Sequence, residues 1–255
     1  MKLLWIKSLL ILAVLTAYSH AIFGIGAQYA PNFTAEIEAS QDTVLYQNTT
    51  NSNIMLNQKS ETGLIGFGGK FWIDFLPFID IEASTNIQFK EYGAALEADL
   101  DGNGTIDTTI ELEVEAPIVG KRTPPFVKVS SDLSIKYPFL KFPPAISILK
   151  LYVGAGITHV MSTVMLDTEF ATKAVTGAGV TDPTDTQAIS NAIVDAFKDE
   201  GLQSGIGGHA LVGAKAKLPV IPIAVFVDGK IHFGGGLPDA VSNGLTLEMG
   251  AALAF

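Results

Sequence analysis

The last twelve residues of the chain, Gly244 to Phe255, constrain its fold more than any other stretch. Every second position is apolar, and in an extended strand these positions share one side. They are Leu245, Leu247, Met249, Ala251, Leu253 and Phe255. A soluble protein seldom ends on such a strand, because an unpaired apolar edge invites aggregation and chain ends fray. We therefore expect the strand to be paired on both sides, as in a closed barrel whose apolar side meets lipid.

Seven earlier segments alternate in the same way, which is the pattern of half-buried strands. They are residues 23–29, 65–75, 79–90, 127–137, 149–158, 206–217 and 224–233. The third is the clearest, with Ile81 and Ala83 on one face and Asp80 and Glu82 on the other. No apolar run after the first 21 residues reaches the ~20 residues that a spanning helix needs. The sequence therefore predicts eight strands.

The connections between these segments alternate in length. Three are short, around residues 76–78, 139–145 and 218–222, and the others are mostly long, at 31–60, 97–124 and 167–203, with a shorter one at 236–243. An even number of strands with both chain ends on the side of the short turns is the topology of bacterial outer-membrane barrels. Aromatic residues gather at the short-turn ends, as in an interfacial girdle. They are Phe75, Phe78, Tyr137, Phe139 and Phe142.

The terminal Phe255 and the alternating apolar residues before it resemble the C-terminal strand of bacterial outer-membrane β-barrel proteins, which often carry another aromatic at the position of Leu253. The chain as a whole resembles the small OmpA-like and OmpW-like barrels. This resemblance implies an all-β fold over residues 22–255, an eight-stranded antiparallel up-and-down transmembrane β-barrel with one short helix in a long extracellular loop. It also implies the bacterial outer membrane as location, with outer-membrane lipid and the barrel assembly machinery, acting on the strand ending in Phe255, as partners.

The first 21 residues have the pattern of a cleaved signal peptide. Lys2 and Lys7 precede an apolar run at 9–17, and Ser19-His20-Ala21 forms a small-x-small cleavage site. The rest of the chain has 14 basic and 26 acidic residues, a net charge of −12. This balance argues against nucleic acid as a partner. The absence of Cys excludes disulfides and thiol catalysis.

The face opposite the apolar one carries charges of both signs. If lipid surrounds the barrel, these residues line the lumen: Lys70, Asp74, Asp80, Glu82, Lys90, Lys128, Asp132, Lys136, Lys150, Lys215, Lys217, Asp228, Lys230 and Glu248. An eight-stranded barrel is just wide enough for side chains to fill. Opposite charges in that space are expected to pair, because an unpaired buried charge is costly. A packed polar core is therefore favoured over an open pore.

Alternation alone does not say which face points outward. A secreted, soluble eight-stranded ligand-binding barrel would place the apolar face inside and the charged face in water. The signal peptide, the terminal Phe255, the unequal connections and the aromatic residues at the turns favour the membrane.

The sharpest local motif runs from Asp99 to Asp107. Asp99, Asp101, Asn103 and Asp107 occupy positions 1, 3, 5 and 9, with Gly104 at position 6, which matches the start of a calcium-binding loop. The motif resembles the EF-hand, dockerin and thrombospondin-type calcium segments, although Ile110 stands at position 12 and Glu111 is one residue late. We expect either a Ca²⁺ site or a polar turn that caps a hairpin beyond the membrane.

The longest connection contains a predicted helix. Asp182 is expected to be its N-cap, with Pro183 at the first helical position and Gly201 as its stop. Between them lies an apolar stripe, comprising Ala188, Ile189, Ala192, Ile193, Ala196 and Phe197. The stripe must be buried, either as a plug or lid, in a partner interface, or against the barrel rim.

The sequence offers little support for catalysis. His159, His209 and His232 have no metal partner at a typical spacing, and Ser162 follows His159 by three residues, which points the two side chains to opposite sides of a strand. The segment 205–210 fits a dinucleotide-binding pattern but lacks the required strand before it and helix after it. We expect a non-enzymatic protein with a structural or surface-binding role through its long loops. The alternatives are a narrow, porin-like channel or carrier for small or hydrophobic solutes, and the secreted soluble binding barrel.

Overall fold

The computed structural model describes residues 23–47, 53–74, 78–116, 120–143, 148–180, 182, 185–200, 202–218 and 221–255. The predicted signal peptide at 1–21 lies outside these residues, as do Phe75, Pro183 and Gly201.

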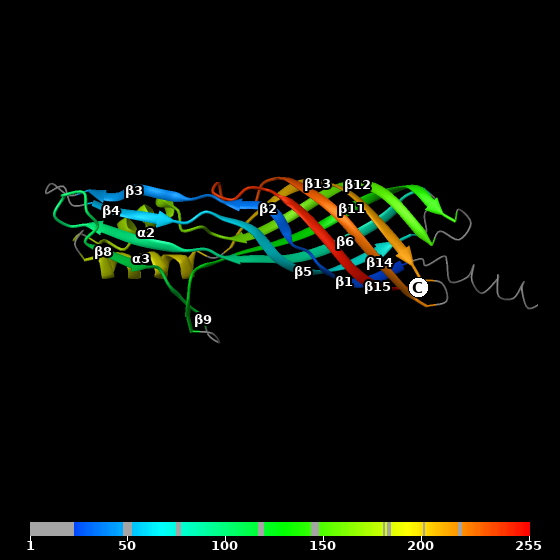
Figure 1. Ribbon diagram of the computed structural model, residues 1–255, viewed down its shortest axis with the longest axis horizontal. Coiled ribbons are helices and arrows are strands. Elements are labelled where there is room, and N and C mark those ends of the chain that lie inside the picture. Colours follow the sequence, from blue (N-terminus) through cyan, green and yellow to red (C-terminus); the bar gives the residue numbers. More distant parts are fainter. Residues whose placement is uncertain are drawn as a thin grey trace, which may run out of the picture.

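Eight antiparallel strands form a closed ring (Figure 1). They are β1 (Phe23–Tyr29), β5 (Glu61–Ile73), β6 (Asp80–Glu91), β11 (Pro125–Phe142), β12 (Leu149–Thr163), β13 (Leu202–Lys217), β14 (Ile223–Gly234) and β15 (Leu245–Ala254). The first strand, β1, pairs with both β5 and β15 and so closes the barrel. Phe255 and Phe23 exchange backbone hydrogen bonds of 2.9 and 3.1 Å beside the last rung. The predicted eight-stranded up-and-down barrel of the outer-membrane type is confirmed, with every strand in the expected segment.

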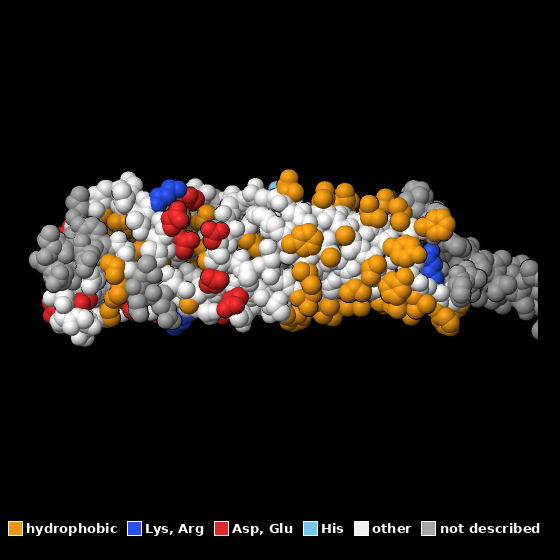
Figure 2. Space-filling view, turned by 90° about the horizontal axis from the view of Figure 1, so that it is seen from above, with side chains coloured by type: hydrophobic (Ala, Val, Ile, Leu, Met, Phe, Trp, Pro, Cys, Tyr) orange, Lys and Arg blue, Asp and Glu red, His pale blue; other side chains and the backbone are white. Residues whose placement is uncertain are grey.

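The outside of the barrel is apolar. Figure 2 shows hydrophobic side chains gathered over the barrel half of the molecule and acidic side chains on the other half. Ile157 is 61% exposed and Ile206 is 76% exposed, whereas the alternate positions point inward. A soluble barrel would bury the apolar face, so the secreted soluble alternative does not fit this structure. Among the described residues, no helix has the length and apolarity needed to cross a membrane.

Exposed aromatic residues lie at both edges of the apolar surface, as the girdles of a membrane barrel do. At the end with the short turns they are Phe78, Tyr137, Phe139 and Phe142, and toward the long connections they include Tyr29, Phe67, Phe89 and Phe233. The rings of Tyr29 and Phe67, on neighbouring strands, are 5.4 Å apart. The two groups mark the boundaries expected for the hydrocarbon layer.

Beyond the barrel, the long connections fold into a separate layer of structure, here called the head. After β2 (Asn32–Ile37), which continues beside β5, the head contains a four-stranded antiparallel sheet in the order β3 (Ser40–Gln47), β4 (Asn53–Gln58), β7 (Ala94–Asp99) and β8 (Thr108–Glu111). It also contains α2 (Thr168–Gly177), α3 (Thr186–Asp199) and a hairpin of β9 (Val114–Ala116) and β10 (Gly120–Arg122). Figure 1 shows it at the opposite end from the C-terminus.

The head has its own hydrophobic core. Strand residues such as Ile54, Leu56 and Leu96 pack in one cluster with Ile189 and Ile193 of α3. The apolar stripe predicted for the loop helix is therefore buried against the head sheet, which the sequence did not predict. The contacts are not those of a lid over the barrel mouth, because α2 contacts β3 and α3 contacts β7.

The prediction of one short helix, capped by Asp182, was wrong in two respects. The described residues contain two helices, and α3 is capped by Asp185, whose carboxylate accepts from the N–H of Ala188 at 2.9 Å. Asp185 is favoured because its side chain reaches the third residue of the helix, as an N-cap must. The second helix, α2, begins in the same way at Asp167, whose carboxylate accepts from Phe170 N at 2.8 Å.

Candidate functional site in the barrel interior and the head

The middle of the lumen is organised around the amine of Lys70. Its Nζ lies 3.2 Å from Glu82 Oε1 and 2.9 Å from Glu248 Oε2, and it also contacts Asp228 Oδ2. Lys136 bonds to Glu82 and lies 3.2 Å from Asp228. The side chains of these five residues are at most 4% exposed. Each buried carboxylate therefore has a cation beside it, as a low-dielectric interior requires.

A second group of paired charges fills the lumen near the short turns. Lys215 Nζ lies 2.8 Å from Asp74 Oδ2, and Lys150 Nζ lies 3.1 Å from the same oxygen and 3.4 Å from Asp80 Oδ2. Asp74 follows β5, and Lys215 comes from β13 on the opposite side of the ring. This contact crosses the full width of the lumen.

A third group lies nearer the head. Lys230 Nζ is 3.0 Å from Asp132 Oδ2, 2.8 Å from Glu248 Oε1 and 2.7 Å from Ser84 Oγ. Ser84 on β6 and Lys230 on β14 come from opposite strands of the ring, so the lumen is also crossed here. His209 and His232 surround the other side of Asp132.

Glycines on the inner face make room for these long side chains. A Cβ at Gly213 would lie 1.8 Å from Asp228 Oδ1, and one at Gly24 would lie 2.2 Å from Cζ2 of Trp72. These distances are too short for any side chain, so the polar groups occupy the space that the glycines leave.

Thirteen of the fourteen residues predicted to line the lumen have buried side chains inside the barrel. They are Lys70, Asp74, Asp80, Glu82, Lys128, Asp132, Lys136, Lys150, Lys215, Lys217, Asp228, Lys230 and Glu248. Lys90 differs, because β6 continues past the apolar surface and places its amine 3.2 Å from Glu61 in a pair that is about one third exposed. Uncharged residues of the inward face, which were not among the predicted lumen charges, also take part: the amide of Gln28 donates to Asn86 Oδ1 at 2.6 Å.

Ser134, His209 and Asp132 have a superficial likeness to a hydrolytic triad. Ser134 Oγ lies 2.8 Å from His209 Nε2, but His209 Nδ1 is 3.7 Å from Asp132 Oδ1. Ser134 is fully buried, so a substrate does not reach its hydroxyl. His159 faces outward and Ser162 inward, as the spacing predicts. The arrangement favours a structural polar network over catalysis.

The loop from Asp99 to Asp107 joins β7 to β8 at the end of the head. Carboxylate oxygens of Asp99, Asp101 and Asp107 lie within 4.8 Å of one another. Burial acts to raise the pKa of Asp99, but backbone N–H groups of residues 104, 102 and 103 donate to its carboxylate and hold its pKa below the ordinary value. The loop therefore gathers carboxylate oxygens of the kind that Ca²⁺ prefers.

The other two positions of the calcium motif are less favourable. Asn103 Oδ1 accepts from the N–H of Thr105 at 2.7 Å. Glu111 pairs with Ala95 at the end of β8, three residues after Thr108, which pairs with Ala98. At the rise of a strand, Glu111 is therefore roughly 10 Å from Thr108. The bidentate acid of a high-affinity loop is therefore not supplied by Glu111.

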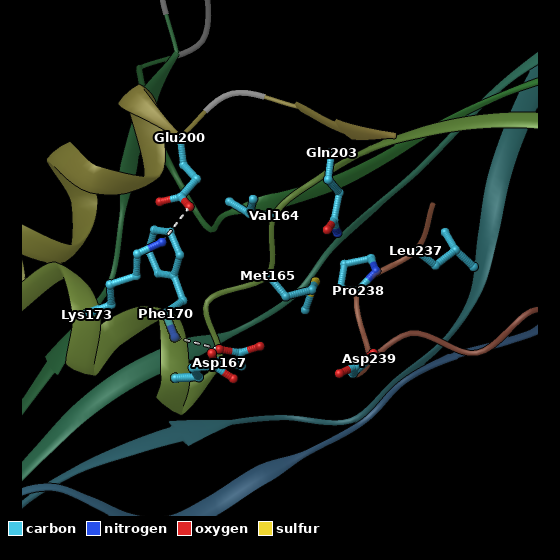
Figure 3. A pocket seen from close by; sticks show the side chains of 11 residues that line it. Val164, Met165, Asp167, Phe170, Lys173, Glu200, Gln203, Leu237, Pro238 and Asp239 are labelled. Carbon is cyan, nitrogen blue, oxygen red and sulfur yellow. Dashed lines mark hydrogen bonds and ion pairs between the residues drawn. The ribbon is translucent and has the colours of Figure 1, made fainter. Parts of the chain in front are cut away.

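A pocket of about 280 Å³ lies where the barrel meets the head (Figure 3). Its apolar part comes from Val164, Met165, Phe170, Leu237 and Pro238, and its polar part from Asp167, Glu169, Lys173, Glu200, Gln203 and Asp239. Figure 3 shows the Lys173–Glu200 pair on one side and Asp239 on the other. The Lys173 amine is 3.3 Å from Glu200 Oε1, so one of four acids is already neutralised. The sequence did not predict this site, because its residues come from two separate connections, β12–β13 and β14–β15, and from the start of β13.

No protein-family model matches the sequence, and no curated protein matches it. Similar solved structures include Ail, the attachment invasion locus protein of Yersinia pestis, at 11% identity and a TM-score of 0.40, with 91% of this chain and 97% of that chain covered. The structure of Ail with the heparin analogue sucrose octasulfate gives the same values. The outer membrane protein OprG from Pseudomonas aeruginosa has 11% identity and a TM-score of 0.41, with 91% and 95% covered. The closed barrel is established by the strand pairing within this structure.

Proposed function

We propose that this chain is a non-enzymatic protein of the bacterial outer membrane that binds a partner at the cell surface through its folded head. In this orientation the short turns and chain ends face the periplasm, and the head faces the outside. The observation that carries the proposal is the shared core of the head, in which strands β4 and β7 and helices α2 and α3 bury their apolar residues together. Connections that served only to join strands would not need such a core.

The alternative role as a channel or carrier has less support, because paired side chains cross the lumen at two levels. Lys215 meets Asp74 near the periplasmic end, and Lys230 meets Ser84 nearer the outside. A solute would have to separate buried ion pairs in order to pass, which is costly in a low-dielectric interior.

The pocket between barrel and head gives the proposed binding role a defined chemistry. It brings apolar side chains together with four acids and one lysine, which favours a ligand with an apolar body and a cationic amine. The acidic balance of the whole chain acts in the same direction by attracting cations.

The experiment is a calorimetric titration of the purified, detergent-folded protein with spermidine as the cationic probe. Asp239→Asn and Glu200→Gln are each expected to weaken binding by up to about fivefold, since an exposed ion pair contributes up to ~1 kcal/mol. Added salt should weaken it further. Asp195→Asn is the matched control, because Asp195 is an exposed acid of α3 that does not line the pocket. Equal losses in all three variants, or binding indifferent to salt, would contradict the proposed site.

The loop of Asp99, Asp101, Asn103 and Asp107 is proposed as a weak Ca²⁺ site of the head. We expect a dissociation constant of roughly 10⁻⁴–10⁻³ M, the range of extracellular calcium modules, because the bidentate acid is missing. Asp101→Asn is expected to abolish the calcium-dependent rise in the head's melting temperature, measured by differential scanning fluorimetry. Glu111→Gln should leave it unchanged, and a loss there would instead assign Glu111 to the ion.

A further inference from the structure

Three residues that can ligate a metal lie close together in the part of the lumen nearer the head, although they are far apart in the sequence. Asp132 comes from β11, His209 from β13 and His232 from β14, and one ligand atom of each lies within 4.8 Å of the other two. All three are buried. We propose that these residues form a binding site for a divalent transition-metal ion, with Zn²⁺ as the best-fitting case.

The distances suit a tetrahedral ion. Asp132 Oδ1 lies 3.3 Å from His232 Nε2 and 3.7 Å from His209 Nδ1. Zinc bonds of about 2.0–2.2 Å to nitrogen and oxygen place neighbouring ligand atoms of a tetrahedron roughly 3.3–3.6 Å apart. Two imidazoles and one carboxylate are also the donor types that zinc accepts.

The surrounding groups orient the three ligands toward one point. Ser134 Oγ lies 2.8 Å from His209 Nε2, so it can accept the proton of that nitrogen and leave Nδ1 free for the metal. Lys230 holds Asp132 Oδ2 at 3.0 Å, which leaves Oδ1 facing both rings. Among the described residues, His232 Nδ1 has no hydrogen-bond partner, so the polar contacts of that buried ring are on the Asp132 side.

The fourth position also has a suitable neighbour. Thr158 Oγ1 lies 2.8 Å from both Asp132 Oδ1 and His209 Nδ1. Without a metal this hydroxyl links the two residues. With a metal bound, it can bind the ion directly or hold a water molecule on it.

The charge of the ion can also be accommodated. The amine of Lys230 lies 3.0 Å from Asp132 Oδ2, and it also lies 2.8 Å from a second carboxylate oxygen, Glu248 Oε1. Lys230 therefore remains paired when Asp132 gives an oxygen to the metal. The bound ion would join β11, β13 and β14 on one side of the lumen and so stabilise the barrel independently of any ligand of the head.

The test is refolding of the tag-free chain in detergent with Zn²⁺, followed by dialysis and elemental analysis of the folded fraction. Wild type and His159→Ala are expected to retain about one zinc per chain, because His159 faces outward. Asp132→Asn and His232→Gln, which preserve side-chain size, should retain less than about a tenth as much, and Ser134→Ala should bind ~10–100-fold more weakly.

Heat-modifiable gel mobility shows whether each variant has folded. If the ligand variants fail to fold, the ligands of zinc in the wild-type protein are identified by X-ray absorption at the zinc edge. Two imidazoles together with oxygen ligands are expected. A wild-type barrel that retains no zinc, a zinc spectrum without imidazole, or equal loss in His159→Ala and His232→Gln would overturn the site.

Discussion

Replacing Lys70 by alanine is expected to lower the free energy of unfolding of the barrel by about 3–5 kcal/mol, because it removes one partner from buried ion pairs. The amine of Lys70 lies among carboxylates from three other strands, Glu82, Asp228 and Glu248. Without it, three buried acids share the remaining amines of Lys136 and Lys230. The measurement is urea unfolding of the protein in lipid vesicles, followed by tryptophan fluorescence and gel mobility.

The same variant is expected to change conductance. The wild-type barrel should show no discrete channels in planar bilayers, whereas Lys70→Ala removes a long side chain from the centre of the network and leaves excess negative charge. Water and cations can then enter, so small cation-selective openings are expected.

Lys90→Ala is the matched control for Lys70→Ala. Lys90 also forms a lysine–glutamate pair, but its side chain is 32% exposed, so its loss should change stability by less than about 1 kcal/mol. Similar effects of the two substitutions would show that the buried network does not stabilise the barrel. Discrete conductance of the wild-type protein would support the channel alternative instead.

Replacing Ile193 by alanine is expected to destabilise the head by about 2–5 kcal/mol while leaving the barrel folded. Ile193 is completely buried in the core that α3 shares with the head sheet, and its truncation leaves a cavity there. The measurement is limited proteolysis in detergent, with the barrel followed by its gel mobility. Cleavage within α2 or α3 should become faster as the core opens more often.

Asp195→Ala is the control on the same helix, because its side chain is 72% exposed and pairs with Lys198 on the surface. It should leave the rate of proteolysis unchanged. A head that resists protease equally well in Ile193→Ala would mean that its elements are held by the barrel and not by their common core.

The eight barrel strands could be predicted because alternation is a local property. Residues two apart lie on the same face of a strand, so segments such as 79–90 and 245–255 show their lipid-facing and inward faces without knowledge of their neighbours. The same rule predicts which face carries Asp80, Glu82 and Glu248. It fails for Lys90, because alternation does not show where along a strand the enclosed lumen ends.

The head could not be predicted in this way. Its strands β4 and β7 are six residues long and β8 is four, too short for a clear period, and their burial depends on helices from another connection. The pocket beside Asp239 could not be predicted either, because it gathers side chains from two connections that are distant in the sequence.

The sequence by itself determined the eight barrel strands and which residues share a face of each, because alternation follows from residues close together in the chain; features spread along the whole chain, such as the unequal connections and the terminal Phe255, then favoured the apolar face as the exterior. Only the tertiary structure decided which charges pair and which ligands meet. Strand register and ring closure bring Lys215 to Asp74 across the lumen, and bring Asp132, His209 and His232 to one point from three strands. Such contacts depend on the relative positions of distant strands, which local alternation does not specify.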